Sequence, residues 1–285
     1  MMPRVLKGIV FALVALISIS VSFSQAPKAG SSVHAFPGRN GIALIAMGQN
    51  GFAIAADGAQ YNADGTISQT QKILQAGKTG AVIFAGKTSQ QDPVGRAVRE
   101  EFNPLRIATP WLEKHPDVSI DTASRELGAI LSEAANKYFA TRVTPKDANK
   151  PAFAAIFVGY ANGQPFMKGS RYFLPAAPGK NLHAELINAA PSPGEIWMLG
   201  LTKVAQELMT GKSAAMDKFK ADPAVEKLRS AKPAERSAQD YASVFNTVLN
   251  AVESAEGRKV DPGPALVGGP NRIATITSKD GFALQ

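Results

Sequence analysis

Four short apolar runs between residues 41 and 86 restrict the fold of this chain more than any other feature. Ile42–Met47 and Phe52–Ala56 contain no charged residue and are joined by a Gly-Gln-Asn-Gly turn. A third run opens at Lys72, and a fourth, Ala81–Ala85, follows it. Apolar and polar residues hardly alternate within these runs, which is typical of strands that are covered on both faces. The pattern predicts strands that lie between two other layers of a layered domain.

Later segments continue this order with helices and further strands. Helical spacing predicts helices that begin near Asp92 and near Ser119. An Asn162-Gly163 turn predicts a hairpin, and Ser237 with Asp240 predicts a capping box before another helix. A final strand is expected at Arg272–Thr277. The order predicts an α+β fold in which two sheets lie between helix layers, a four-layer αββα sandwich.

The N-terminal segment has the pattern of a secretory signal. Arg4 and Lys7 precede the apolar run Gly8–Val21, and small residues follow at 22 and 24. We expect a signal peptide over 1–24 with cleavage near Gln25. The alternative is an uncleaved membrane anchor, although the run is short for a span. Residues 25–40 are rich in Pro, Gly and Ser and are predicted to form a flexible leader before a single domain at 41–285.

Composition limits the chemistry that is open to the chain. There is no cysteine, which excludes disulfides, thiolate catalysis and cysteine metal sites. The formal net charge is +8, and loss of Arg4 and Lys7 with the signal leaves +6. The basic residues are scattered without aromatic interleaving, so no nucleic-acid partner is expected. The expected location is secreted or periplasmic, with no stable membrane span after cleavage.

The segment 41–86 resembles the start of a 20S proteasome subunit, a member of the N-terminal-nucleophile (Ntn) hydrolase superfamily. In active members, a catalytic Thr begins the first strand sixteen residues before an Asp. Counting back from Asp57 leads to Gly41. The interval from Lys72 to Gly86 equals the family's interval from catalytic lysine to oxyanion glycine. The interval from Asp57 to Lys72 is one residue short, which a turn at Asp64-Gly65 can absorb.

The resemblance implies a role for each matching residue. Asp57 would position Lys72, whose positive charge would tune the terminal amine and the hydroxyl, and the Gly86 N–H would stabilise an oxyanion. These three are the candidate catalytic residues of a remnant site whose nucleophile position is Gly41. A structural reading remains open, in which Asp57 and Lys72 form an ion pair at a sheet end and Gly86 permits a tight turn.

Two features depart from the active pattern. Residues 33–56 contain no Thr, Ser or Cys, so a shift of register does not supply a nucleophile. Ser31 and Ser32 lie about ten residues upstream and would need a different cleavage. Active relatives carry Ser-Gly-Gly before the last strand, but Val267 stands in place of that Ser, and Asp261 is farther from the glycines than expected.

The sequence therefore predicts a secreted proteasome-subunit-like protein that is catalytically silent and has a structural, assembly or binding role. The alternative is an active Ntn amide hydrolase with a displaced nucleophile, and a third reading is a small-molecule binding protein that uses the old cleft. Self-association is expected from the apolar stripe Val94, Val98 and Phe102. The peptide or small ligand is not identified.

Neither a metal nor another cofactor is expected. The three histidines, His34, His115 and His183, are isolated and lack the spacing of metal ligands. Trp111 and Trp197 are predicted to pack in the core or at an interface.

Overall fold

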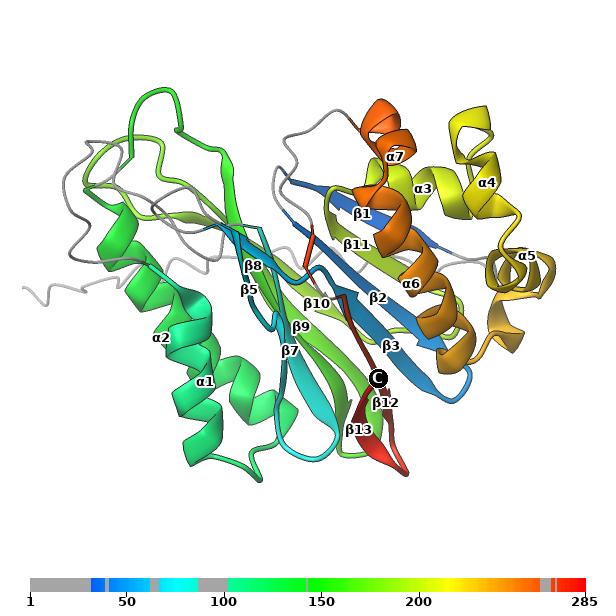
Figure 1. Cartoon of the computed structure of the whole chain (residues 1–285). Helices are drawn as coiled ribbons and strands as arrows, with labels where there is room; N and C mark the ends of the chain where they lie inside the picture. The colour runs from blue at the N-terminus through cyan, green and yellow to red at the C-terminus, as the bar shows by residue number, and fades with distance from the viewer. Residues whose placement is uncertain are drawn as a thin grey trace, which may run out of the picture.

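A computed structural model describes residues 32–38, 41–61, 67–86, 102–141, 143–261, 268–269 and 271–285. Two main sheets and two groups of helices make up these parts (Figure 1). The first sheet has six strands in the order β1-β11-β2-β3-β12-β13. These strands are β1 (Val33–Pro37), β2 (Ile42–Gly48), β3 (Gly51–Ala56), β11 (Ile196–Gly200), β12 (Arg272–Thr277) and β13 (Gly281–Leu284).

The second sheet has five strands in the order β10-β9-β8-β7-β6, and its neighbours pair antiparallel. They are β6 (Ile73–Gln75), β7 (Gly80–Gly86), β8 (Pro151–Ala161), β9 (Gln164–Phe173) and β10 (His183–Ala189). A separate pair consists of β4 (Ala59–Tyr61) and β5 (Ile67–Gln69).

The helices form two groups on opposite sides of the sheets (Figure 1). The first group is α1 (Pro104–Lys114) and α2 (Ile120–Phe139). The second group is α3 (Lys203–Met209), α4 (Asp217–Lys220), α5 (Pro223–Ser230), α6 (Ala238–Glu253) and α7 (Ala255–Val260), with short 3-10 turns at Ala214–Met216 and Pro233–Glu235.

Three apolar clusters hold these elements together. One packs α3, α5 and α6 against the six-stranded sheet, a second packs α1 and α2 against the five-stranded sheet, and the third lies between the sheets. The sequence of β2 lacks alternation because both of its faces are buried. Leu44 packs in the first cluster, and its neighbour Ile45 packs in the third. The prediction of strands covered on both faces is confirmed, since every residue of β2 and β3 is buried.

Several predicted boundaries are confirmed. Helix α2 begins directly after Ser119, whose hydroxyl accepts a hydrogen bond from Thr122 N. The capping box of Ser237 and Asp240 opens α6. The predicted hairpin around Asn162 and Gly163 joins β8 to β9. Helix α2 buries Ala123, Leu127, Leu131 and Tyr138, whereas Ile130 is 39% exposed.

The main difference concerns the expected flexible leader. Its segment Val33–Pro37 is strand β1, which pairs in parallel with β11. Strands β10, β11 and β13 are likewise absent from the elements that the sequence predicts. These strands are short, and β1, β10 and β13 lie at sheet edges. Strands β1 and β11 pair with partners that are distant in sequence. Strands β10 and β13 each pair with the strand just before them, but much of each is exposed, so apolar periodicity does not mark them.

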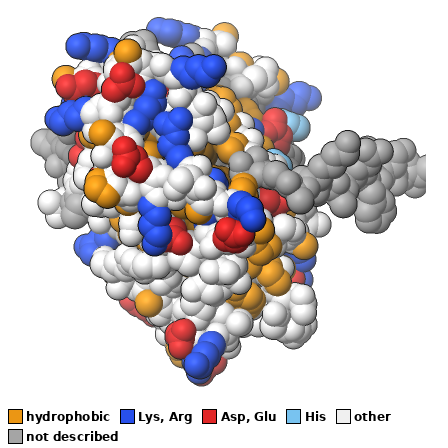
Figure 2. Space-filling view, turned by 90° about the vertical axis from the view of Figure 1, so that its right-hand side faces the viewer, with side chains coloured by type: hydrophobic (Ala, Val, Ile, Leu, Met, Phe, Trp, Pro, Cys, Tyr) orange, Lys and Arg blue, Asp and Glu red, His pale blue; other side chains and the backbone are white. Residues whose placement is uncertain are grey.

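Some expectations fall on residues outside the described ranges. The signal peptide, the Asp64-Gly65 turn and the predicted helix start near Asp92 are among these. The described helix α1 begins later, at Pro104, where the Asn103 side chain caps Leu105 N and Arg106 N. None of the described helices is long and apolar enough to cross a membrane. Figure 2 shows Lys and Arg side chains spread among acidic and uncharged ones on one face of the molecule.

Candidate functional site

The residues singled out by the sequence meet where strands of the two sheets begin and end. Gly41 immediately precedes β2, and Asp57 follows β3 at the same end of this antiparallel pair. Lys72 immediately precedes β6, and Gly86 is the last residue of β7. Because β6 and β7 belong to the second sheet, the site draws two residues from each sheet.

Asp57 and Lys72 form an ion pair that is closed off from solvent. Lys72 Nζ lies 2.7 Å from Asp57 Oδ2, and the two residues are 1% and 0% exposed. The carboxylate also accepts a hydrogen bond from Ile42 N to Oδ1 at 2.8 Å and one from Ala59 N to Oδ2 at 3.3 Å. Backbone N–H groups thus orient the aspartate, and the aspartate fixes the ammonium.

Gly41 lies at the centre of this arrangement. A Cβ built on Gly41 would be 3.0 Å from Asp57 Oδ1, 3.2 Å from Lys72 Nζ and 3.6 Å from Gly86 N. The Gly41 φ of +67° is in the left-handed region, where glycine is favoured. A hydroxyl-bearing side chain at this position would therefore start next to the ammonium and the Gly86 N–H, but glycine supplies no such group.

Residues 33–37, a few positions before Gly41, are part of the six-stranded sheet. The residues of β1 pair with all of β11, and Gly38 N donates to Gly200 O at 2.9 Å. The guanidinium of Arg171 lies 5.1 Å from the centre of the Phe36 ring and donates to Pro37 O at 3.2 Å. These contacts hold residues 33–38 in place.

A small cleft next to Gly86 is partly closed by this upstream segment. Its lining includes Phe36, Pro37 and Gly38 from the segment, together with Gly86 and Gly200. The upstream chain thus forms part of the wall beside the Gly86 N–H.

Of the C-terminal residues that correspond to the supporting Asp and Ser-Gly-Gly of active relatives, the structure describes Asp261 and the two glycines but not Val267. Gly269 packs closely on Gly58, since a Cβ at Gly269 would be 2.9 Å from the Gly58 carbonyl carbon. The glycine pair therefore approaches the chain directly after Asp57. Asp261 caps the C-terminus of α7, where its N–H donates to Gly257 O. Val267 lies outside the described residues.

The structure adds a second carboxylate that sequence reasoning missed. Glu253 ends α6, and its Oε1 is buried without a hydrogen-bond partner. Burial raises the pKa of Glu253 above its ordinary value, and the negative charge of Asp57 raises the pKa further. No local signal marks this residue, because its proximity to Asp57 arises only from the packing of α6 on the sheet.

We expect the substitution Glu253→Gln to raise the midpoint of urea unfolding at pH 7. The raised pKa in the folded state means that the ionised carboxylate opposes folding at pH values above it. Glutamine keeps the shape and removes the charge. The gain should shrink as the pH falls through the ordinary glutamate range, because below that range the carboxyl is protonated in both states. A gain that stays constant between pH 4 and pH 7 would contradict this explanation.

The histidines and tryptophans have packing roles in the structure. The His34 ring stacks on Trp197 at 5.2 Å between centroids, and the His115 ring stacks on Trp111 at 4.3 Å. Among the described residues, no group of three or more His, Asp or Glu side chains is arranged to hold a metal ion.

Comparison with known proteins gives distant structural matches only. No family model and no curated protein matches the chain. The matching solved structures include Anbu from Hyphomicrobium sp. strain MC1, with a TM-score of 0.47 and 14% identity over 86% of this chain and 84% of that chain. Anbu (ancestral beta-subunit) from Yersinia bercovieri matches with a TM-score of 0.48 and 14% identity over 85% of this chain and 86% of that chain. At these scores, the matches decide neither family nor activity.

Proposed function

We propose that this chain is an exported proteasome-subunit-like protein with a four-layer αββα fold that has no threonine-peptidase activity. Its role is in assembly or binding. The signal pattern at 1–24 supports export, and the arrangement of two sheets between two groups of helices supports the fold assignment. Self-association of the chain is part of the same proposal.

The position of Gly41 is the observation that carries the proposal. Asp57, Lys72 and Gly86 surround the point at which a nucleophilic side chain would begin, and residue 41 has no side chain. Covalent amide hydrolysis needs an attacking oxygen or sulfur that is activated by a base. A carboxylate, an ammonium and a backbone N–H can orient and polarise a substrate, but none of them replaces that nucleophile.

The upstream strand supports the same conclusion. N-terminal-nucleophile chemistry needs a free α-amine at the first residue of the mature chain. In the full chain, the Gly41 nitrogen is an amide, because β1 and Gly38 precede it and are bound to β11. Cleavage before Gly41 would leave β1 without its covalent link to β2.

The rival hydrolase with a displaced nucleophile is less compatible with the geometry. Ser32 lies beside Ile196, at the opposite end of β11 from Gly200, which pairs with Ile42. At a rise of about 3.3 Å per residue, this separation is on the order of 15 Å. The Ser32 hydroxyl is therefore too far from Lys72 to take over the role of a residue 41 side chain.

The test is labelling of the purified mature protein with a peptide epoxyketone, followed by intact mass spectrometry. We expect an N-terminus near Gln25, no adduct and no cleavage of fluorogenic peptides. A threonine-dependent proteasome labelled in parallel serves as the positive control. A stoichiometric adduct on the wild-type chain would overturn the proposal.

A further inference from the structure

A second, strongly basic pocket lies on the helix side of the six-stranded sheet. It is a cavity of about 100 Å³ between the start of β1, the start of β11, the end of α3, the end of α5 and the residue before the α6 cap. Its lining consists of Val33, Ile196, Met209, Thr210, Arg229 and Arg236. Two of these residues are arginines and none is acidic.

Arg236 is the unusual residue of this lining, because its positive charge is buried and has no acidic side chain as an ion-pair partner in the described part of the chain. The residue is 8% exposed and forms no ion pair with any described residue. Its Nε and Nη2 donate to Ala231 O at 3.2 and 3.0 Å. No acceptor is found among the described residues for the N–H groups of Nη1. Buried charges are normally paired, so this guanidinium lacks a counter-charge.

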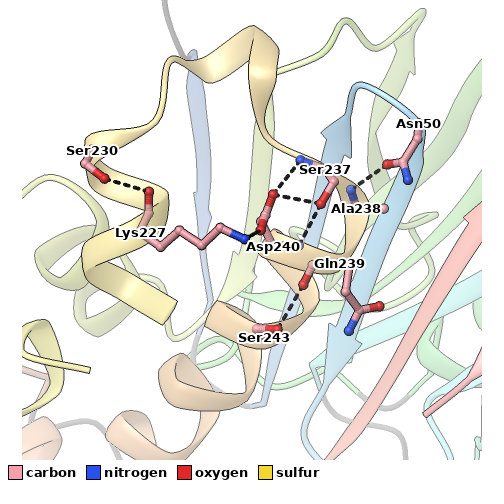
Figure 3. A network of polar contacts seen from close by, with 8 residues as sticks. All are labelled: Asn50, Lys227, Ser230, Ser237, Ala238, Gln239, Asp240 and Ser243. Carbon is pink, nitrogen blue, oxygen red and sulfur yellow. Dashed lines mark hydrogen bonds and ion pairs between the residues drawn. The ribbon is translucent and has the colours of Figure 1, made fainter. Parts of the chain in front are cut away.

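The backbone around Arg236 is held in one position. Arg236 O accepts a hydrogen bond from Gln49 N at 2.8 Å, and Ala238 N donates to Asn50 Oδ1 at 2.8 Å. Figure 3 shows the capping box in which Asp240 accepts hydrogen bonds from Ser237, while Lys227 of α5 pairs with Asp240 at 2.7 Å. Asp240 is therefore already occupied, and the guanidinium is presented from a rigid element.

Two further polar groups close to these elements lack partners. The Ser32 hydroxyl, one residue before Val33, is buried without a hydrogen bond. The Tyr241 hydroxyl makes no well-formed hydrogen bond. Burial raises the pKa of Tyr241, and the nearby Arg236 guanidinium opposes this rise, first as a hydrogen-bond donor to the hydroxyl and then by its charge. The pocket is therefore flanked by one unpaired hydroxyl next to β1 and one hydroxyl in α6 that is within reach of Arg236.

We propose that this pocket binds a small oxyanion, a carboxylate or a phosphate group, which Arg236 holds with its free N–H groups and Arg229 covers from the exposed side. The planar guanidinium matches both groups by bidentate hydrogen bonding. In the same measure, one water molecule needs about 10–15 Å³, so a cavity of about 100 Å³ leaves room for one such group. The proposal is independent of the remnant site and of its activity.

The test measures binding of inorganic phosphate, and separately of acetate, to the full mature chain at constant ionic strength. Isothermal titration should show one saturable site for the wild type. Arg236→Gln should weaken the affinity about tenfold or more, because charge-assisted hydrogen bonds are lost. Arg229→Gln should weaken it by a smaller factor. Arg258→Gln removes the same charge from an exposed position of α7 and should leave the affinity unchanged.

A thermal scan separates site binding from general salt effects. Phosphate stabilises most proteins by exclusion from the surface, and this part should appear equally in all four proteins. Binding should add a rise in Tm for the wild type and Arg258→Gln that Arg236→Gln lacks. Equal rises in all four proteins, or no saturable binding of either anion to the wild type, would overturn the proposal. Arg229→Gln changes an exposed side chain, so it remains informative if Arg236→Gln fails to fold.

Discussion

Replacement of Asp57 by alanine is expected to lower the free energy of unfolding by about 3–5 kcal/mol. The substitution leaves the Lys72 ammonium buried without its partner, which is far more costly than loss of a surface pair. It also removes the acceptor of the Ile42 and Ala59 N–H groups. Urea unfolding at pH 7 measures the effect, with the change in midpoint compared at equal slope.

Two further variants locate the source of this cost. Glu235→Ala removes one partner of the exposed Lys232–Glu235 pair and should change stability by about 1 kcal/mol or less. Asp57→Asn combined with Lys72→Met removes both charges but keeps an oxygen for the Ile42 N–H, so it should recover much of the loss. If Asp57→Ala cost no more than Glu235→Ala, the pair would not be the buried, tightly bound contact described above.

Substitution of Gly41 by threonine is expected to destabilise the full mature chain by about 2 kcal/mol. A β-branched residue at a φ of +67° is strained, and its Cβ would lie 3.0 Å from Asp57 Oδ1. The strain has a specific origin, since φ is restricted by the carbonyl of the preceding residue. A chain whose first residue is 41 has no such carbonyl.

The same substitution should therefore cost much less in a chain that starts at residue 41. Both lengths are compared with and without Gly41→Thr, so that the loss of β1 cancels from the difference. Urea unfolding of the four proteins supplies the measurement. An equal cost at both lengths would show that crowding by Asp57 and Lys72, rather than the attached chain, disfavours a side chain here.

Local patterns in the sequence were sufficient for the central strands and for several helix starts. The buried runs of β2, β3 and β7 are continuous and apolar, and the capping box of α6 is encoded within four residues. The spacing of Asp57, Lys72 and Gly86 also marked three residues that the fold brings together around Gly41. Each of these signals is contained in one segment, or in intervals between neighbouring strands.

The remaining features depend on contacts between distant segments. Strand β1 forms because it pairs in parallel with β11, which lies over 150 residues later in the sequence. A segment that was expected to be a flexible leader is therefore part of the sheet. Glu253 and Arg236 have ordinary local sequences, and only packing buries one near Asp57 and the other without an acidic partner. Sequence periodicity determined the buried strands β2, β3 and β7 and several helices, but not the buried strand β11. Tertiary structure alone decided the pairing of β1 with β11 and the burial of Glu253 and Arg236, because each depends on segments that are far apart in the sequence.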